Sequence, residues 1–206
     1  MRKLLALVLL LRGLTLAQEL PKFDVATPSR QQVLKMRYSG FSTWADQHAG
    51  AMNEVEADFL AGWYAKMRSQ ANVALLKGKP ALAQAMKDLR TWNNDYYDAL
   101  YLYQGGGTMY SHAASRSVAS LADVEADAAL AWTKAPGKTP AGRPFGQVHP
   151  DYSKVEQDQA SLRKAVAAEN ASYQRALASL KKLPGGAREV LGRYLADLSE
   201  AKWGEN

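Results

Sequence analysis

The chain has 206 residues, a net charge of +6 at pH 7 and no cysteine. This length suits one domain, or two small ones, with ample apolar residues for a packed core. The absence of cysteine excludes disulfides, thiolate zinc sites, iron–sulfur clusters, covalent haem and a cysteine-linked lipid anchor. The apolar core must therefore hold the fold by itself.

The segment 1–17 has the layout of a secretory signal peptide. Arg2 and Lys3 form its basic start, an apolar stretch follows, and a small-residue cleavage site ends at Ala17. The apolar stretch is too short to span a bilayer. We therefore expect export to the periplasm or the extracellular space, with no stable membrane span after cleavage. The alternatives are an uncleaved anchor and a cytosolic chain.

Removal of 1–17 lowers the net charge to +3, because that segment holds three basic residues and no acid. Such a small charge of mixed sign argues against nucleic acid as a partner. Residues 18–27 are expected to form an extended lead-in. Residues 28–206 are expected to form a single helical-bundle domain.

The first helix is predicted over 28–77, where apolar residues recur every three or four positions. Thr27 and Pro28 start it, because a proline in the first turn of a helix loses no hydrogen bond. A continuous helix of this length would measure about 75 Å. A bend or break is expected at one of three glycines, Gly40, Gly50 or Gly62.

A short turn at 78–80, Gly-Lys-Pro, ends the first helix and starts the next within three positions. These two helices are therefore expected to pack antiparallel. Apolar stripes predict the next two helices over about 81–104 and 109–134. Three consecutive glycines at 105–107 lie between them.

The segment 135–150 contains four prolines and three glycines, which predicts a long loop. Ser153 and Glu156 form a capping box for a helix that reaches about Leu183, and a shorter helix extends to Trp203. No segment shows the alternation of a strand. The chain is therefore predicted to be all-α, an antiparallel bundle of four to five helices whose first helix is long and bent or broken.

The glycines at 105–107 are explained by a tight corner between two helices. A Walker-type phosphate loop needs a lysine after its glycines, and a dinucleotide loop needs a preceding strand; the sequence has neither. Tyrosines gather on both sides of the corner, and their apolar bodies and wet hydroxyls suit either a bundle end or a binding surface. The candidate ligand-binding residues at this end are Asn93, Asn94, Tyr97, Asp98, Tyr101, Tyr110, His112 and Arg116.

Two acidic blocks, 54–58 and 123–127, resemble each other at an offset of 69 residues, and each precedes a tryptophan. Acids four residues apart share a helix face, so a carboxylate metal site between two helices is one interpretation. The chain has no Glu-x-x-His motif, and two solvated acidic faces are the simpler interpretation. The metal-ligand candidates are Glu54, Asp58, Asp123 and Asp127.

These patterns favour an exported cell-envelope protein that acts as a non-enzymatic binding or interaction module. Its partner would be a polypeptide, a cell-wall glycan or a small ligand, and no cofactor is expected. One alternative is an envelope hydrolase that uses acids near His112 and Arg116, although no G-x-S-x-G elbow is present. The other alternative is a carboxylate metal-binding bundle.

Overall fold

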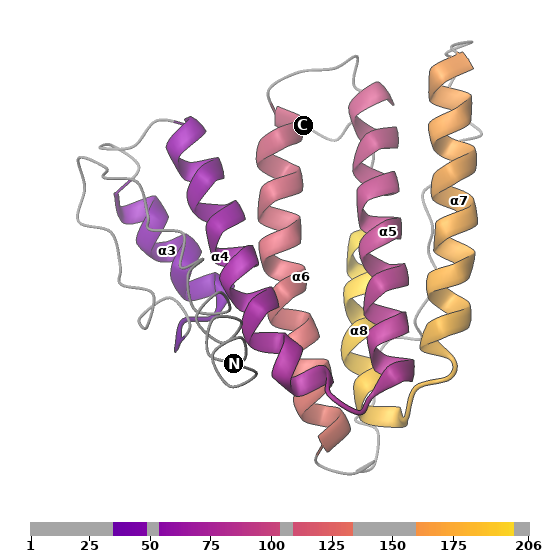
Figure 1. Cartoon of the computed structure of the whole chain (residues 1–206). Helices are drawn as coiled ribbons and strands as arrows, with labels where there is room; N and C mark the ends of the chain where they lie inside the picture. Colours follow the sequence, from indigo (N-terminus) through magenta and orange to yellow (C-terminus); the bar gives the residue numbers. More distant parts are fainter. Residues whose placement is uncertain (1–34, 49–53, 104–108, 134–159, 200–206) are drawn as a thin grey trace, which may run out of the picture.

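A computed structural model of the chain describes residues 35–48, 54–103, 109–133 and 160–199. These ranges contain helices and no strand, which confirms the all-α prediction. The described ranges hold six helices where four to five were expected, because the predicted first helix is divided. They are α3 (Tyr38–Gln47), α4 (Glu54–Leu76), α5 (Pro80–Tyr103), α6 (Met109–Thr133), α7 (Ala160–Leu180) and α8 (Gly185–Ser199), as labelled in Figure 1.

The division of the first predicted helix falls after Gln47, where α3 ends. The next residue, His48, stacks its ring on Trp44 at a centroid distance of 4.6 Å. Its Nδ1 lies 2.7 Å from the carbonyl oxygen of Trp44, a contact that closes the last turn of α3. Of the three glycines considered, Gly40 and Gly62 lie inside α3 and α4, and Gly50 lies outside the described residues.

The turn between α4 and α5 agrees with the prediction. Gly78 has a φ of 74°, a left-handed conformation that glycine adopts without strain. The N–H of Lys79 donates to the carbonyl oxygen of Leu76 at 3.0 Å. Pro80 is the first residue of α5, where its missing N–H costs no hydrogen bond. The observed bounds of α5 and α6 lie within one residue of those predicted.

The prediction that α4 packs along α5 is wrong. α4 makes few contacts with α5, and its main partner is α6, beside which it runs in the same direction (Figure 1). The reason is the fit of side-chain sizes. Leu60, Tyr64 and Met67 of α4 are large and buried, and α6 offers the small Ala119 opposite them.

The remaining helices form an antiparallel group of four. α5 packs against α7, and α6 packs against α8. α5 and α6 also contact each other, which joins the two pairs. α6 therefore lies in the middle of the molecule, with α3 and α4 on one side and α5, α7 and α8 on the other (Figure 1).

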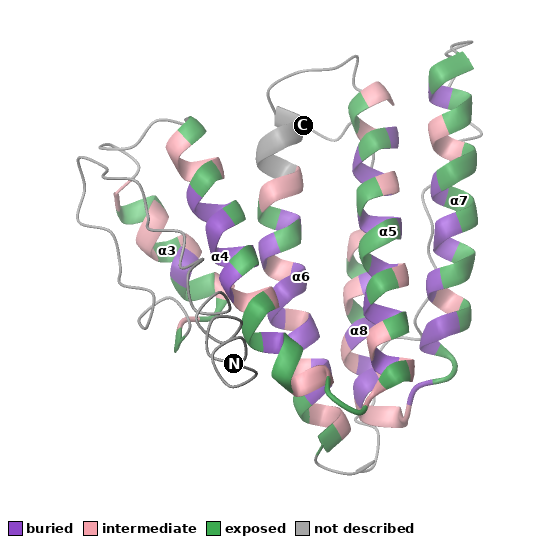
Figure 2. Ribbon diagram, viewed as in Figure 1, coloured by how far each residue is buried: buried purple, intermediate pink, exposed green. Residues whose placement is uncertain are grey.

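The four-helix core is built around the fully buried Trp92, and Figure 2 shows burial along the inner faces of these helices. The Trp92 ring lies 5.5 Å from the Tyr96 ring and 5.9 Å from the Tyr173 ring. Its indole N–H donates to Oε1 of the buried Glu169 at 2.6 Å. The other buried members are Leu82, Ala85, Met86, Leu89, Tyr97, Leu121, Ala128, Ala129, Ala176, Leu180, Leu183, Ala187, Leu191 and Leu195.

A second, smaller cluster lies on the other side of α6, between α3 and α4. Phe41 of α3 stacks on Tyr64 of α4 at a centroid distance of 4.9 Å, and Tyr38 lies 5.9 Å from the same ring. The buried members of this cluster are Phe41, Leu60, Trp63, Tyr64, Ala65, Met67 and Ala119.

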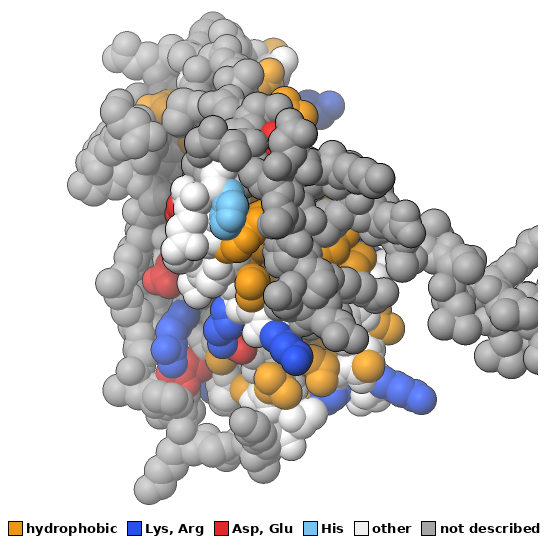
Figure 3. Space-filling view, turned by 90° about the vertical axis from the view of Figure 1, so that its left-hand side faces the viewer, with side chains coloured by type: hydrophobic (Ala, Val, Ile, Leu, Met, Phe, Trp, Pro, Cys, Tyr) orange, Lys and Arg blue, Asp and Glu red, His pale blue; other side chains and the backbone are white. Residues whose placement is uncertain are grey.

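On the surface viewed from the α3 and α4 side, Lys and Arg side chains lie among Asp and Glu side chains (Figure 3).

Several predictions fall outside the described residues and stay predictions. They concern the signal segment 1–17, the lead-in 18–27, the corner at 105–107, the loop at 135–150 and the capping box of Ser153 and Glu156. Among the helices that the structure describes, none is long and apolar enough to cross a membrane.

Candidate functional site

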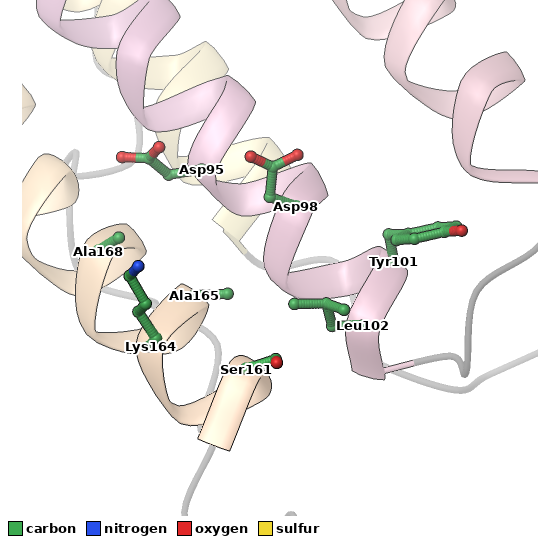
Figure 4. A pocket seen from close by; sticks show the side chains of 8 residues that line it. All are labelled: Asp95, Asp98, Tyr101, Leu102, Ser161, Lys164, Ala165 and Ala168. Carbon is green, nitrogen blue, oxygen red and sulfur yellow. The ribbon is translucent and has the colours of Figure 1, made fainter. Parts of the chain in front are cut away.

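A surface groove between α5 and α7 overlaps the tyrosine-rich region that the sequence singled out. Its volume is about 390 Å³, within the range of small-molecule sites. The C-terminal half of α5 and the N-terminal half of α7 form its walls (Figure 4). The lining residues of this α5–α7 groove are Asp95, Asp98, Tyr101, Leu102, Ser161, Lys164, Ala165 and Ala168.

Helical spacing places these side chains in two facing rows. Asp95, Asp98 and Leu102 are three and four positions apart, so they share one face of α5. On α7 the same spacing brings Lys164 and Ala168 onto one face. The alanines that α7 presents to the groove carry only a methyl group, which leaves space between the two helices. The groove therefore follows from small residues on α7 opposite larger ones on α5.

One end of the groove carries opposite charges on its two walls. In Figure 4 the Lys164 ammonium and the Asp95 carboxylate approach each other across the groove, and Asp98 lies one turn along from Asp95. Lys164 and Asp98 are exposed, whereas Asp95 is half-buried. Within the described contacts no ion pair joins Asp95 to Lys164. This end of the groove therefore carries a carboxylate on the α5 wall and an ammonium group on the α7 wall.

The other end of the groove is apolar. Leu102 and Ala165, both half-buried, form its floor where the helices approach their ends. Tyr101 is 37% exposed and points outward from α5 at the rim (Figure 4). Ser161 adds a hydroxyl on the α7 side. The groove thus changes from charged to apolar along its length.

Asn93, a predicted site residue, lies in the interior and not in the groove. Its Oδ1 accepts hydrogen bonds from the hydroxyls of Ser117 and Tyr194, each at 2.7 Å. Burial raises the pKa of the Tyr194 hydroxyl, so this group remains a neutral donor. The three side chains join α5, α6 and α8, and the two hydroxyls satisfy the oxygen of the buried amide.

The other predicted residues of α5 divide between core and surface. Tyr97 is buried and meets the Tyr96 ring edge-on at 5.1 Å, and burial raises the pKa of its hydroxyl. Asn94 is exposed outside the groove. Asp98 and Tyr101 line the groove. The structure therefore brings two of the five predicted α5 residues together at one site.

The predicted residues of α6 do not join the groove. Arg116 is exposed, and its charge acts on the hydroxyl of Tyr38 in α3, on the opposite side of α6 from the groove. Tyr110 and His112 lie within α6, and their side chains are outside the described part of the structure. No described contact links Arg116 to Asp98 or another groove carboxylate.

Asp123, a metal-ligand candidate, binds protein groups instead. It is 4% exposed, and its Oδ1 accepts the Tyr64 hydroxyl at 2.6 Å and lies 2.8 Å from Nε of Arg68. Its Oδ2 accepts the backbone N–H of Tyr38, the first residue of α3. Arg37 at the N-cap makes no side-chain cap of its own. A carboxylate from α6 therefore caps α3, where the helix dipole favours negative charge.

The other acidic candidates are dispersed. Asp127 forms an ion pair with Arg37, which precedes α3. Asp58 is half-buried on α4, and the Glu54 side chain is outside the described part. Among the described residues, no three His, Asp or Glu groups lie close enough together to hold a metal ion. The metal-binding alternative gains no support from these positions.

A further charged contact joins the two sides of the molecule. Arg90 of α5 donates to both carboxylate oxygens of Glu125 on α6, from Nε at 2.6 Å, and also reaches Ser69 of α4 at 3.2 Å. Glu125 is fully buried, and this burial raises its pKa although Arg90 acts in the opposite direction. The pair therefore stabilises the meeting point of α4, α5 and α6.

A second groove, of about 380 Å³, lies between α6 and α8. Two of its polar side chains, Tyr194 and Arg193, have partners within the protein. Tyr194 bonds to Asn93 and Ser117, and Arg193 donates to Glu189 at 2.8 Å. Its lining residues are Ser120, Val124, Val190, Arg193, Tyr194, Asp197 and Leu198. The α5–α7 groove is therefore the better candidate site.

Comparison with protein-family models, with curated proteins and with solved structures gives no match for this chain.

The α7 wall of the groove was missed by sequence reasoning. Its signal is present in the chain, since Ser161, Ala165 and Ala168 put small residues on one helix face beside Lys164. That pattern shows which residues of α7 share a face. It does not show that α5 lies opposite them.

Proposed function

We propose that the protein is an exported, non-enzymatic binding module of the cell envelope, and that the α5–α7 groove is its binding site. The observation that carries this proposal is an open groove of about 390 Å³ with Asp95 and Lys164 on opposite walls and an apolar end. Convergent polar groups in a partly apolar hollow are typical of ligand sites. Export is proposed from the signal-like segment 1–17 alone.

Binding is favoured over catalysis by where the perturbed titratable groups lie. Burial raises the pKa of Tyr64, Tyr194 and Glu125, and none of these lines the groove. Each one hydrogen-bonds to side chains that hold helices together. Perturbed groups at a catalytic site would instead converge on the hollow that receives the substrate.

A thermal-shift screen of the purified protein tests the binding function. The screen contains amino acids, short peptides, cell-wall glycan fragments, small aromatic compounds and metal salts. A ligand that binds the folded state raises the Tm with its concentration. Ala168→Trp fills the groove, and Ala167→Trp is its matched control, because Ala167 is exposed on α7 outside the groove.

The expected result is a compound that raises the Tm of the wild type and of Ala167→Trp but not of Ala168→Trp. If no compound raises the Tm, or if the two variants respond equally, the groove is not the site. Export is tested separately by the mass of the protein recovered from the periplasm or medium. Cleavage after Ala17 leaves Gln18 as the first residue.

A further inference from the structure

We infer that one end of the bundle binds the surface of a lipid bilayer that contains anionic phospholipids. This basic end is formed by the turn between α4 and α5 and by the turn between α7 and α8 (Figure 1). Its cationic residues are Lys77, Lys79, Lys181, Lys182 and Arg188. The surface is separate from the α5–α7 groove, and its binding does not depend on the proposed function.

The two turns lie together because they close the same end of the four-helix core. Leu82 in the first turn of α5, Leu180 at the end of α7 and Leu183 just after it belong to one buried cluster. Leu76, in the last turn of α4, packs against that cluster. The cations beside these leucines are therefore held at one end of the molecule, although the two turns are far apart in sequence.

The basic end has cations and no acids of its own. Three of its cationic residues are exposed and two are half-buried. The described segments that reach this end, 74–87, 128–133 and 178–188, contain no Asp or Glu. The positive potentials of neighbouring cations add, so this end attracts an anionic surface more strongly than a single lysine does.

The nearest acids are bonded to other groups. Asp88 of α5 accepts hydrogen bonds from Gln84 at 2.9 Å and from the hydroxyl of Ser179. Glu189 is 8% exposed, and it forms an ion pair with Arg193 at 2.8 Å. Among the residues that the structure describes, no ion pair joins a cation of the basic end to an acid. An anion from outside the chain is therefore the partner that this charge fits.

Helix capping explains only part of this charge. Lys77 and Lys181 directly follow α4 and α7, and the ammonium group of Lys79 donates to the carbonyl oxygen of Leu75. Cations are favoured at such helix ends. Arg188, in contrast, lies in the first turn of α8, where the helix dipole disfavours a cation. An anionic surface beyond the end of α8 offsets this cost.

Apolar side chains beside the cations favour a bilayer over an acidic polypeptide. Leu130 in the last turn of α6 is 42% exposed, and Trp132 in the same turn is half-buried. A Cβ added to Gly186 would lie 3.4 Å from the Cβ of Ala131, so this turn lies next to the first turn of α8. Tryptophan, leucine and lysine together suit the boundary between lipid headgroups and acyl chains.

Binding by the basic end keeps the α5–α7 groove away from the bilayer. The groove is lined by the C-terminal half of α5 and the N-terminal half of α7, whereas the basic end holds the opposite ends of these helices. Asp95 comes 15 positions after Pro80, a rise of about 22 Å along α5. The bilayer and a ligand of the groove can therefore be bound at the same time.

Co-sedimentation of the full chain with phospholipid vesicles tests this inference. One set of vesicles is pure phosphatidylcholine, and the other is equal parts phosphatidylcholine and phosphatidylglycerol. We expect the protein to bind the anionic vesicles at least about tenfold more tightly than the neutral ones, because each cation is attracted by the anionic headgroups. Added salt should weaken the binding, since it screens exposed charges.

Two double variants locate the binding surface. Lys181→Gln with Lys182→Gln should bind the anionic vesicles about 25-fold more weakly, because each cation near an anionic bilayer strengthens binding about fivefold. Arg116→Gln with Lys164→Gln is the matched control with the same change in net charge, because both residues are exposed in the opposite halves of α6 and α7. It should bind about as tightly as the wild type. All these proteins keep segment 1–17, so its own affinity for bilayers cancels in the comparison.

Leu130→Ser and a soluble polyanion test the choice of a bilayer. The variant should bind the anionic vesicles about threefold more weakly, because part of an exposed leucine no longer enters the apolar boundary. Polyglutamate should bind the wild type more weakly than the vesicles do, because it offers charge alone.

Three results would overturn the inference. The first is equal binding to neutral and anionic vesicles. The second is an equal loss of binding in the two double variants, which would place the site elsewhere. The third is tight binding of polyglutamate that depends on Lys181 and Lys182 while the vesicles do not bind or Leu130→Ser binds them as the wild type does; the partner is then an acidic polypeptide.

Discussion

The two sides of α6 are held by different interactions. On one side, α5, α7 and α8 bury mostly leucines and alanines around Trp92. On the other side, α3 and α4 contact α6 through a small aromatic cluster, and the start of α3 is held by the carboxylates of Asp123 and Asp127. The four-helix core is therefore maintained by apolar burial, and the α3 side depends on a few directional contacts.

This difference has consequences for how each side opens. Apolar burial is non-directional and shared by many side chains, so the four-helix core should unfold as one unit. α3 has only 10 residues, too few for a helix to be stable in isolation. We expect α3 to open locally while α5 to α8 remain folded.

The largest expected effect comes from Trp92→Ala in the four-helix core. The change removes a fully buried ring and takes a hydrogen-bond donor from Glu169. We expect a loss of about 3–5 kcal/mol in the free energy of unfolding, because the cavity and the lost donor both destabilise. Urea denaturation followed by circular dichroism measures this loss.

Val73→Ala is the control for the core prediction. Val73 is 66% exposed on α4, so its truncation should change the free energy of unfolding by no more than about 0.5 kcal/mol. If Trp92→Ala lowers the free energy of unfolding by no more than Val73→Ala does, apolar burial around Trp92 does not dominate the stability.

A smaller and local effect is expected from Asp123→Ala. The variant loses the cap on α3 and the bond from Tyr64, and it leaves the largely buried Arg68 without this carboxylate. We expect opening of α3 to become easier by about 2–3 kcal/mol. Hydrogen exchange should show faster exchange of α3 amides and unchanged protection in α5 to α8. A uniform increase in all helices would contradict the comparison.

Arg37→Ala is the matched control for the α3 side. The Arg37 side chain is 60% exposed, so its ion pair with Asp127 is screened by solvent. Its loss should cost at most about 1 kcal/mol, and less at high salt. If Arg37→Ala opens α3 as much as Asp123→Ala does, the capping contact is not what holds the helix.

The smallest expected effect is a change of stability with pH. It comes from the Arg90–Glu125 contact, which joins the two sides of the molecule. Burial raises the pKa of Glu125 above its ordinary 4.5. Between 4.5 and that raised value the folded state binds the proton more than the unfolded chain does, so this contribution to stability is lost as the pH rises. Glu125→Gln removes the titration while keeping an acceptor for Arg90.

The measurement is the free energy of unfolding of the wild type and of Glu125→Gln from pH 4.5 to pH 7. The wild-type value minus the variant value should fall as the pH rises. A difference that grows with pH would mean that the Arg90 contact outweighs the burial of the Glu125 carboxylate.

Local patterns in the sequence were sufficient for the helices themselves. The apolar stripes located α5 and α6 to within one residue, and Gly78 and Pro80 marked the turn before α5. These features depend on backbone conformation and on the periodicity of a single helix, which neighbouring residues decide. The gathering of tyrosines and polar residues before the glycine corner identified Asp98 and Tyr101, two of the residues that line the groove.

The choice of partners was decided only by the tertiary structure. Periodicity shows which face of α4 is buried, but only the folded structure shows that this face packs against Ala119 and Asp123 of α6. Asp123 caps α3 across 85 positions of chain, and Lys164 lines the same groove as Asp95 only because α7 lies beside α5. Such contacts depend on the packing of distant helices in three dimensions, which no local pattern encodes.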